Sequence, residues 1–478
     1  MIGWGIVVKE DASMAMGKQS QEQQDPLWIP THAIAKGPGS PFYARLNRMF
    51  KASGFDRWVE GRCEGFYAKK QGRPSIPPGV YFRMLMIGYF EGLDSERGIA
   101  WRCADSLTPR EFLGFALTEP TPDHSTLSRV RNRIDLETHQ EVFGWILSRL
   151  VEHGLIKGKT IGVDATTLEA NAAMRSLIRR DTGEGYDEFL TTLAKESGIE
   201  TPTRQDLARL DRKRKGKASN DDWLNPNDPD AKITKMKDGR THLAHKAEHA
   251  VDMDSGATLA VTVQPANRGD TKSLDETLSE VVENLDELSD DDQRFTMQEL
   301  VADKGYHSND VLCDIAELEI RTYISEPDRG RRRWQNRERE RRAVYANRRR
   351  IRGARGKALL RQRGEKLERP FAHCYETGAM RRTHLRGHEK ILKRILIHVG
   401  ASNLSLLMRT LFGIGKPKTL QGRCRRAMAV LRATWRAFAP DLCPDCLAVW
   451  VDRALMLVCA IRANRIRVRE EARCSTGC

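Results

Sequence analysis

The stretch TIGVDATTLEAN, residues 160–171, decides the fold of this chain. Its apolar and β-branched residues predict a buried strand, and Asp164 stands near the end of the apolar part. A second segment, LVADKGYHS at residues 300–308, repeats this arrangement, because three apolar residues lead into Asp303 and a turn that contains glycine. Open α/β sheets bind their ligands at the carboxyl ends of the strands. The two aspartates are therefore predicted to face one site.

Two carboxylates at neighbouring strand ends predict a site for divalent metal ions. Without a cation, the like charges repel and raise a pKa, whereas bound Mg²⁺ or Mn²⁺ makes the pair favourable because both ions prefer oxygen ligands. Two ions about 3.5–4 Å apart stabilise the attacking and leaving oxygens of an in-line phosphoryl displacement. The alternative is that each aspartate only caps a turn or a helix. The matching settings of Asp164 and Asp303 favour a site with two ions.

A third carboxylate is expected from the segment RQRGEKLERPF, which offers Glu365 and Glu368. The segment before them has a helical pattern. Glu368 is preferred, because Pro370 and Phe371 directly after it resemble the inner face of a helix that packs on a sheet. Glu365 lies one turn earlier and remains the alternative. The predicted catalytic and metal-binding residues are thus Asp164, Asp303 and Glu368.

Length and charge restrict the class of protein. The chain has 478 residues, a formal net charge of +15 and a pI of about 9.4. Such an excess of cations suits a polyanionic partner such as DNA, RNA or an anionic membrane. No continuous run of about 18 apolar residues occurs, so no spanning helix is expected, and the N-terminus does not resemble a secretory signal. The ten cysteines have no framework spacing, which is typical of reduced thiols in the cytoplasm.

Composition divides the chain into four parts. Residues 1–40 are predicted to be a mobile tail, residues 41–150 a helical domain of the DNA-binding type, and residues 416–478 a basic helical tail. Residues 151–415 form the predicted catalytic domain, with the order strand, hairpin, helix, strand, helix, strand. A polar region at about residues 172–240 interrupts it and is interpreted as an inserted loop or subdomain.

Basic side chains in three places are candidates for DNA contacts. Arginines on the last helix of the helical domain fit a helix-turn-helix-like contact, and two residues after Asp303 lie close enough to touch flanking phosphates. The arginine-rich region 329–366 fits contacts that fix the DNA register. A solvated or disordered basic face is the alternative for each. The candidates are Arg129, Arg131, Arg133, Lys304, His307, Arg331, Arg332, Arg333, Tyr345, Arg348 and Arg349.

Several blocks, in the same order along the chain, resemble the DDE transposases of bacterial insertion sequences. The blocks are GVDATTLEAN, ADKGYHSND and GEKLERPFAHCYETGAMRRTHLRG, preceded by PSIPPGVYFRMLMIGYFEGLDSERGIAWRCADSL and TPDHSTLSRVRNRI. The resemblance implies an α/β fold with a ribonuclease H-like core, in which helices flank a mixed five-stranded sheet, after an all-helical N-terminal domain. It places Asp164 on the first strand, Asp303 on the fourth and Glu368 on the helix after the fifth.

The same resemblance implies a function. Such an enzyme cuts the ends of an insertion sequence and joins them to target DNA by two-metal-ion phosphoryl transfer, without a covalent link between enzyme and DNA. Its partners are the inverted-repeat ends, the target DNA and further copies of itself, as a homodimer or larger assembly. No membrane is involved, and the expected location is the bacterial cytoplasm, at the nucleoid. The alternatives are a metal-dependent nuclease on the same fold and an inactive DNA-binding protein or repressor.

The sequence departs from the family in one place. Many relatives carry Tyr, two residues, Arg, three residues, Glu, and then six residues and a basic residue. Here Tyr345 and Arg348 fit the first half, but Arg352 stands where the glutamate is expected. Counted from Glu368, the basic position holds Tyr375. The third acid is therefore less firmly predicted than the two aspartates.

Overall fold

The computed structural model describes residues 39–68, 75–214, 218–236, 239–330 and 332–417. Its helices and strands all belong to one compact unit that begins at Ser40. The predicted tails, residues 1–40 and 416–478, fall almost entirely outside the described residues. Cys443 and Cys446, which have the spacing of half a zinc site, also lie outside them.

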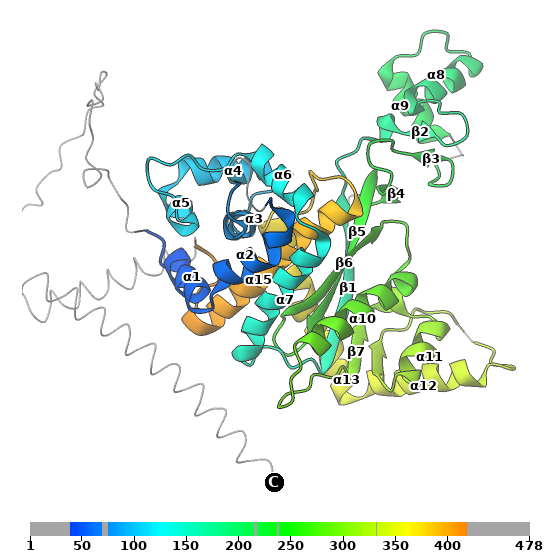
Figure 1. The fold of residues 1–478 in the computed structure, drawn as a ribbon. Coiled ribbons are helices and arrows are strands. Elements are labelled where there is room, and N and C mark those ends of the chain that lie inside the picture. Colours follow the sequence, from blue (N-terminus) through cyan, green and yellow to red (C-terminus); the bar gives the residue numbers. More distant parts are fainter. Residues whose placement is uncertain (1–38, 69–74, 215–217, 237–238, 331, 418–478) are drawn as a thin grey trace, which may run out of the picture. The chain divides into compact units, whose positions relative to one another are not determined.

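The first part of the unit is helical, as the sequence predicts (Figure 1). Almost every residue of its central helix, α3, is buried, and Pro78 starts this helix because proline is accommodated in the first turn. Ser95, Asp123 and Asp135 cap α4, α6 and α7 by accepting backbone N–H groups of the first turn. The helical elements are α1 (Pro41–Ala52), α2 (Phe55–Cys63), η1 (Glu64–Phe66), α3 (Pro78–Glu91), α4 (Glu96–Asp105), α5 (Leu107–Leu113), α6 (His124–Arg133) and α7 (Leu136–Glu152).

A mixed sheet forms the α/β part, with the spatial order β4-β5-β1-β7-β8, and β6 also pairs with β5. β1 is antiparallel to β5 and parallel to β7, which is in turn parallel to β8. The sheet has six strands, one more than the resemblance implies. β4 and β6 pair with successive parts of the same edge of β5, so the sheet is five strands wide. The strands are β1 (Thr160–Glu169), β4 (Lys232–Lys235), β5 (Thr241–Asp252), β6 (Thr258–Pro265), β7 (Glu299–Ala302) and β8 (Arg321–Ile324).

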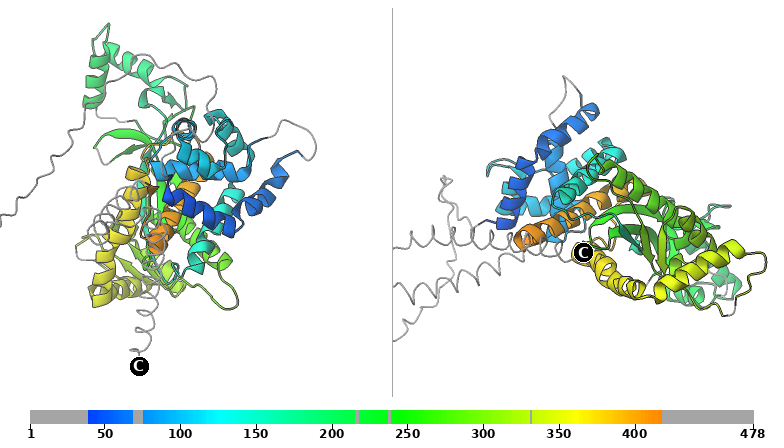
Figure 2. Two further views of the ribbon diagram at one scale, coloured as in Figure 1. Left: turned by 90° about the vertical axis from the view of Figure 1, so that its left-hand side faces the viewer. Right: turned by 90° about the horizontal axis from the view of Figure 1, so that it is seen from below.

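Helices cover both faces of this sheet (Figures 1 and 2). On one face, α10 (Asp270–Glu287) and α11 (Asn309–Glu317) join the main hydrophobic core through residues such as Leu274 and Leu312. On the other face, Leu359 and Leu367 pack on Val301 in a separate cluster. The elements that follow β8 are α12 (Glu338–Arg352), α13 (Ala354–Arg363), η4 (Gly364–Glu368), α14 (Arg369–Phe371) and η5 (Ala372–Thr377).

The last described helix, α15 (His388–Phe412), connects the helical part to the sheet. It packs against α3, α7 and β6, and most of its residues are buried. By length and composition alone, α15 is the one helix among the described residues that could cross a membrane. Two-thirds of its most apolar window is buried inside the protein, which is typical of a core helix.

The inserted region is a folded subdomain rather than an open loop. Its polar composition indicates a poor core former, but Leu177, Tyr186, Leu190 and Trp223 are buried together in a small cluster of their own. Tyr186 and Trp223 meet edge to face, with ring centroids 5.0 Å apart. The subdomain consists of η2 (Met174–Ser176), β2 (Ile178–Arg179), α8 (Tyr186–Glu196), α9 (Arg204–Lys213) and β3 (Trp223–Leu224), followed by β4 of the main sheet.

Candidate active site

Asp164 and Asp303 lie next to each other at the point where the parallel pairing of β1 with β7 ends. Val163 of β1 pairs with Ala302 of β7; Asp164 is the next residue of β1, and Asp303 directly follows the last residue of β7. The expectation that the first strand ends at Asp164 is corrected, because β1 continues to Glu169. Adjacent strands lie roughly 4.8 Å apart, and side chains alternate between the two faces of a sheet. Because residues at even spacing share a face, both aspartates lie on the side on which Val301 contacts Leu367. The register thus brings the two acids together as the sequence predicts, although only Asp303 follows the end of its strand.

Backbone groups hold both carboxylates. Asp164 Oδ1 accepts the N–H of Ala165 at 2.8 Å. Asp303 begins the short helix η3 (Lys304–Tyr306), and its Oδ1 accepts the N–H of Gly305 at 2.7 Å. These bonds fix the orientation of one oxygen of each acid.

A close packing contact brings Glu368 to the same face of the sheet. Residues 354–377 are helical throughout, with wide π-helical turns on both sides of Pro370, which has no N–H to donate in a helix interior. Leu367 is buried against Gly162 of β1. A Cβ at Gly162 would lie 2.8 Å from Cδ1 of Leu367 and 2.6 Å from the sulfur of Met253, so only glycine permits this approach. Glu368 follows directly.

Arg363 connects the first aspartate to this glutamate. Its Nη1 lies 3.1 Å from Oδ2 of Asp164, and its Nη2 lies 3.5 Å from Oε1 of Glu368. Glu365 is highly exposed and pairs at 3.8 Å with Arg369, one turn along the same helical run. Of the two candidate glutamates, Glu368 is the one that shares a cation with Asp164.

The surroundings of Asp164 destabilise the ionised form of its carboxyl group. The pKa of Asp164 is raised to about 6, mostly by burial and also by the nearby charges of Asp303 and Glu368, against the N–H of Ala165 and the guanidinium of Arg363, which lower it. An acid whose pKa lies this far above its ordinary value gains from a bound cation. Perturbed carboxyl groups of this kind are concentrated at functional sites.

A buried polar network supports the Asp303 turn. The hydroxyl of Tyr306 donates to the buried carboxylate of Glu248 at 2.8 Å, and Ser273 and Thr277 donate to the same carboxylate at 2.7 and 2.6 Å. Next to it, Lys246 donates to Asp270 at 2.6 Å. Sequence reasoning missed this network and also Arg363, because their spacing along the chain carries no pattern that identifies them.

Tyr375 occupies the position at which relatives carry a basic residue, and it points into the protein. It is buried, and its hydroxyl lies 2.5 Å from Nε2 of His249. His249 is the register partner of Asp164 on β5. Burial lowers the pKa of His249 to about 3, so its imidazole is neutral. Where the resemblance places a cation that could contact DNA, this chain therefore has the uncharged pair of Tyr375 and His249 beside Asp164.

The arginines predicted on α6 divide into two groups. Arg129 and Arg133 are exposed, and the guanidinium of Arg133 lies over the ring of Tyr67 at 5.0 Å. The structure corrects the expectation for Arg131, which is buried and forms an ion pair with Glu96. A buried guanidinium needs a carboxylate partner, so Arg131 joins α6 to α4 rather than facing DNA.

The two candidate residues after Asp303, Lys304 and His307, differ in their exposure to solvent. Lys304 is exposed next to the acid. His307 is buried, and neither of its ring nitrogens has a hydrogen-bond partner among the described residues, so the predicted contact with DNA is corrected to an interior position. Burial lowers the pKa of His307 as well.

The arginine-rich region is partly structural. Arg332 and Arg348 both form ion pairs with Glu326, which corrects the expectation that they are free to bind phosphates. Arg333, Tyr345 and Arg349 are exposed, with the guanidinium of Arg348 5.0 Å from the centre of the Tyr345 ring. Arg331 lies outside the described residues.

The donor set at the sheet edge fits a hard divalent cation, since carboxylate oxygens are the ligands that Mg²⁺ and Mn²⁺ prefer. In the described part of the chain, no three His, Cys, Asp or Glu side chains are arranged to coordinate one ion together. Between Asp164 and Glu368 lies the guanidinium of Arg363, which places one positive charge beside both carboxylates.

Comparison with known families agrees with this geometry. Residues 34–133 match the sequence model of a family described as transposase domain (DUF772), and residues 197–404 match that of the transposase DDE domain. The second match includes Asp303 and Glu368 and begins after Asp164. No curated protein sequence matches the chain. The helical region, the mixed sheet and these two matches together show that the chain belongs to the DDE transposases of insertion sequences, enzymes that act on DNA.

Proposed function

We propose that this protein cuts the ends of its insertion sequence and joins them to target DNA, with Asp164, Asp303 and Glu368 as the catalytic carboxylates. One observation supports the proposal: Glu368, from a distant helical turn, shares the guanidinium of Arg363 with Asp164, which the register of β1 and β7 places beside Asp303. Carboxylates brought close together repel one another, and a cation between them lowers that cost.

The three carboxylates would hold two divalent ions, Mg²⁺ or Mn²⁺. When bound, such ions lower the pKa of water and stabilise negative charge on the attacking and leaving oxygens of a phosphodiester. The side chains must be deprotonated to serve as ligands. Because the pKa of Asp164 is raised to about 6, its readiness to bind a cation increases as the pH rises through that value.

The protein's own residues would position DNA and screen its charge. Lys304, exposed beside Asp303, lies where it can neutralise a phosphate that flanks the reacting one. Water attacks the phosphodiester at the end of the element, and the freed 3′-hydroxyl then attacks the target strand. No side chain forms a covalent bond to DNA, so positioning and charge neutralisation supply most of the rate.

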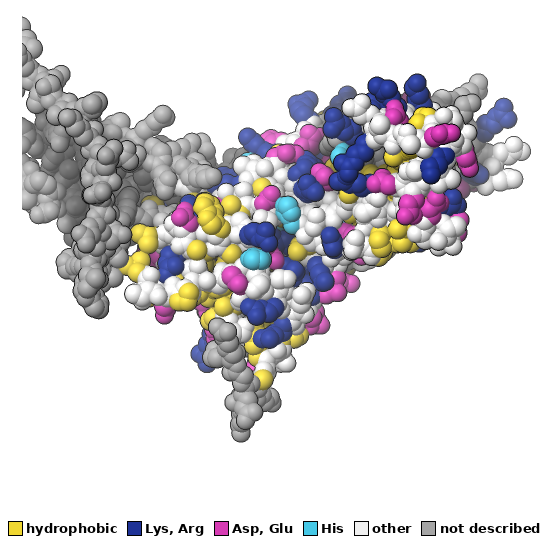
Figure 3. All heavy atoms as spheres, turned by 90° about the horizontal axis from the view of Figure 1, so that it is seen from above, with side chains coloured by type: hydrophobic (Ala, Val, Ile, Leu, Met, Phe, Trp, Pro, Cys, Tyr) yellow, Lys and Arg dark blue, Asp and Glu magenta, His cyan; other side chains and the backbone are white. Residues whose placement is uncertain are grey.

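Exposed cations provide a wider surface for DNA. Lys and Arg side chains are spread over one face of the protein, with Asp, Glu and His side chains among them (Figure 3). The candidate cations that remain exposed are Arg129, Arg133, Lys304, Arg333 and Arg349, and Tyr345 is exposed as well. Two ends of one element must react together, and each needs a site, so the active form would be a homodimer or larger assembly at the bacterial nucleoid.

A strand-transfer reaction tests the proposal. Duplex DNA that carries the inverted repeat flanking the gene is incubated with supercoiled plasmid, Mg²⁺ and the full-length protein, and joined products are separated on a gel. The expected result is cleavage at the repeat followed by joining, both lost in Asp164→Asn. Cleavage without joining would assign a nuclease instead. Binding with neither reaction, and no effect of Asp164→Asn, would assign an inactive DNA-binding protein.

A further inference from the structure

The turn after Asp303 rests on a buried group of polar and charged side chains. The hydroxyl of Tyr306 donates to Glu248 at 2.8 Å, and the ammonium of Lys246 lies 3.4 Å from the same carboxylate and donates to Asp270 at 2.6 Å. Tyr306, Glu248 and Lys246 are each at most 4% exposed. These four side chains, Tyr306, Glu248, Lys246 and Asp270, are named here the turn-support network.

The turn-support network lies on the opposite face of the sheet from the catalytic acids. Glu248 accepts a hydrogen bond from Ser273 of α10, so its side chain faces that helix. Its neighbour His249 points to the other face, because side chains alternate along a strand, and His249 is the register partner of Asp164. The turn that follows Asp303 therefore connects the acids on one face to the network on the other.

Gly305 allows the network to approach Asp303. A Cβ at this glycine would overlap Oδ2 of Asp270 and would lie 3.0 Å from Oδ1 of Asp303, the oxygen that accepts the N–H of Gly305. Both carboxylates thus touch the same glycine. Lys246 holds the other oxygen of Asp270, so a movement of the network is passed on to the carboxylate of Asp303.

Tyr306 reaches from the network toward the first aspartate. Burial raises the pKa of Tyr306 well above its ordinary value, and the charges of Glu248, Asp270 and Asp164 act in the same direction. The hydroxyl therefore stays protonated and remains a hydrogen-bond donor. The influence of Asp164 places the ring of Tyr306 close to both aspartates.

The charge of the network favours a cation near Asp303. Burial of charged groups costs hydration, and well-packed apolar residues of similar volume are often at least as stable. Lys246 pairs with both Glu248 and Asp270, so one ammonium balances two carboxylates and one negative charge remains. A negative charge beside a carboxylate raises the cost of ionising it unless a cation binds there.

We propose that the turn-support network positions the second aspartate: Tyr306 and Asp270 set the orientation of the Asp303 carboxylate and thereby the affinity of the site for a divalent cation. Groups that hydrogen-bond around metal ligands typically change metal affinity by about 10- to 100-fold when they are mutated. Tyr306 and Asp270 are positioning residues, because they act through Asp303. The inference rests on the proposed function, since it takes Asp303 as a metal ligand.

Titration of the full-length protein with Mn²⁺, with free Mn²⁺ measured by electron paramagnetic resonance, reports this affinity without the reaction. Tyr306→Phe removes only the hydroxyl and should raise the Kd for Mn²⁺ about 10-fold. Tyr323→Phe is the matched control, because Tyr323 is also buried and donates to a buried carboxylate, that of Glu299, at 3.1 Å. Glu299 lies four residues before Asp303, roughly 13 Å along an extended strand, so the Kd of this variant should stay near that of the wild type.

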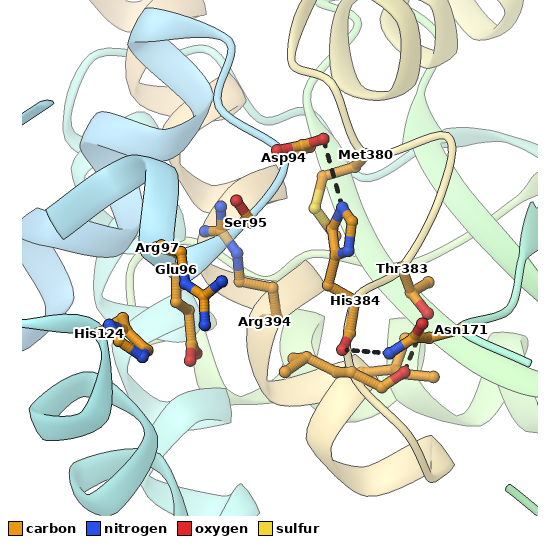
Figure 4. A pocket seen from close by; sticks show the side chains of 12 residues that line it. Asp94, Ser95, Glu96, Arg97, His124, Asn171, Met380, Thr383, His384 and Arg394 are labelled. Carbon is orange, nitrogen blue, oxygen red and sulfur yellow. Dashed lines mark hydrogen bonds and ion pairs between the residues drawn. The ribbon is translucent and has the colours of Figure 1, made fainter. Parts of the chain in front are cut away.

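A second pair of variants tests the charge of the network. Asp270→Asn keeps the shape of the side chain, removes a negative charge beside Asp303 and should also raise the Kd for Mn²⁺ about 10-fold. Asp94→Asn is its control. Asp94 pairs with His384 at 3.3 Å in a separate cavity of about 400 Å³ near the starts of α4 and α6 (Figure 4), so the Kd should not change.

The cleavage rate separates positioning from a structural defect. At limiting Mn²⁺, Tyr306→Phe should be slower than Tyr323→Phe, whereas at saturating Mn²⁺ it should come within about threefold of the wild-type rate. Equal Kd values for these two variants would overturn the positioning role. If Tyr306→Phe does not fold, equal Kd values for Asp270→Asn and Asp94→Asn would overturn it. Wild-type binding of Mn²⁺ that Asp303→Ala retains would overturn the proposed metal site as well, which is a distinguishable result.

Discussion

Arg363 Nη1 lies 3.1 Å from Oδ2 of Asp164, although the two residues are 199 positions apart in the chain. The same guanidinium reaches Glu368 at 3.5 Å. The side chain of Arg363 is about one-fifth exposed, so its charge acts in a partly desolvated setting where it is screened less than at the surface. A fixed cation at this point keeps the acids together in the metal-free protein.

Arg363→Gln is expected to slow metal-dependent cleavage about 10- to 100-fold, equivalent to about 1.4–2.7 kcal/mol. Removal of the guanidinium also removes a charge that lowers the pKa of Asp164, so the acidic limb of the pH–rate profile should move to higher pH. Single-turnover cleavage across pH measures both effects. Arg361→Gln, an exposed change on the same helix, is the control. Equal rates and profiles for the two variants would contradict a positioning role.

The pKa of Asp164 predicts how stability depends on pH. Its folded value of about 6 lies above the ordinary value of 3.8, so folding favours the protonated form, and this contribution is lost as the pH rises from about 4 through 6. Asp164→Asn mimics the protonated form. In metal-free protein it should raise the free energy of unfolding by about 1–3 kcal/mol at pH 8 and by less at pH 5.

Urea unfolding at both pH values measures this gain, with the exposed Glu365→Gln as the control for removal of one negative charge. If Asp164→Asn instead lowers the free energy of unfolding at pH 8, the ionised carboxylate stabilises the fold and has a structural role.

Glu368→Gln should reduce cleavage at least 100-fold, because a neutral amide is a poor ligand for a hard cation. Glu365→Gln should stay within about twofold of the wild-type rate, since Glu365 pairs only with Arg369 in the structure described. Both variants change one charge on the same helical run, which makes them a matched pair in one cleavage assay. The reverse order of rates would identify Glu365 as the third acid.

Gly162→Ala should destabilise the protein by about 1–3 kcal/mol and also slow cleavage, because the new methyl group would push Leu367 and hence Glu368 away from the sheet. Gly144→Ala in α7 is the control, since its nearest contact is 3.6 Å and alanine favours a helix. Thermal unfolding and cleavage are measured together. An active and fully stable Gly162→Ala would remove the argument that this contact positions Glu368.

A short apolar run followed by an acid is a local pattern, and from two such runs the sequence predicts that Asp164 and Asp303 lie close together. β7 ends before Asp303 as expected, whereas β1 continues past Asp164 to Glu169. The register of Val163 against Ala302 then needs only parallel pairing of the two strands. The ordering of strands and helices follows from periodicity in the same way. These features depend on neighbours within about ten residues.

Other features depend on contacts between distant segments and could not be predicted. The burial of Arg131 depends on Glu96 in another helix, and the interior position of His307 depends on how its turn packs. The pairing of Arg363 with Asp164 joins residues 199 positions apart, and the wide helical turn that follows Arg363 leads to Glu368, which pairs with the same guanidinium. Polar composition also concealed the small core around Trp223.

Metal rescue tests the central claim most directly. In Asp303→Cys, a thiolate replaces a carboxylate at the proposed site, and thiolates bind Mg²⁺ poorly but accept softer ions such as Mn²⁺. The cleavage rate of Asp303→Cys in Mg²⁺ should fall at least 100-fold below that of the wild type. Replacement of Mg²⁺ by Mn²⁺ should raise the rate of this variant at least tenfold, whereas Asp303→Ala stays inactive with both ions. Equal activity of Asp303→Cys and wild type in Mg²⁺, or an equal loss with both ions, would contradict the claim that Asp303 holds a metal ion.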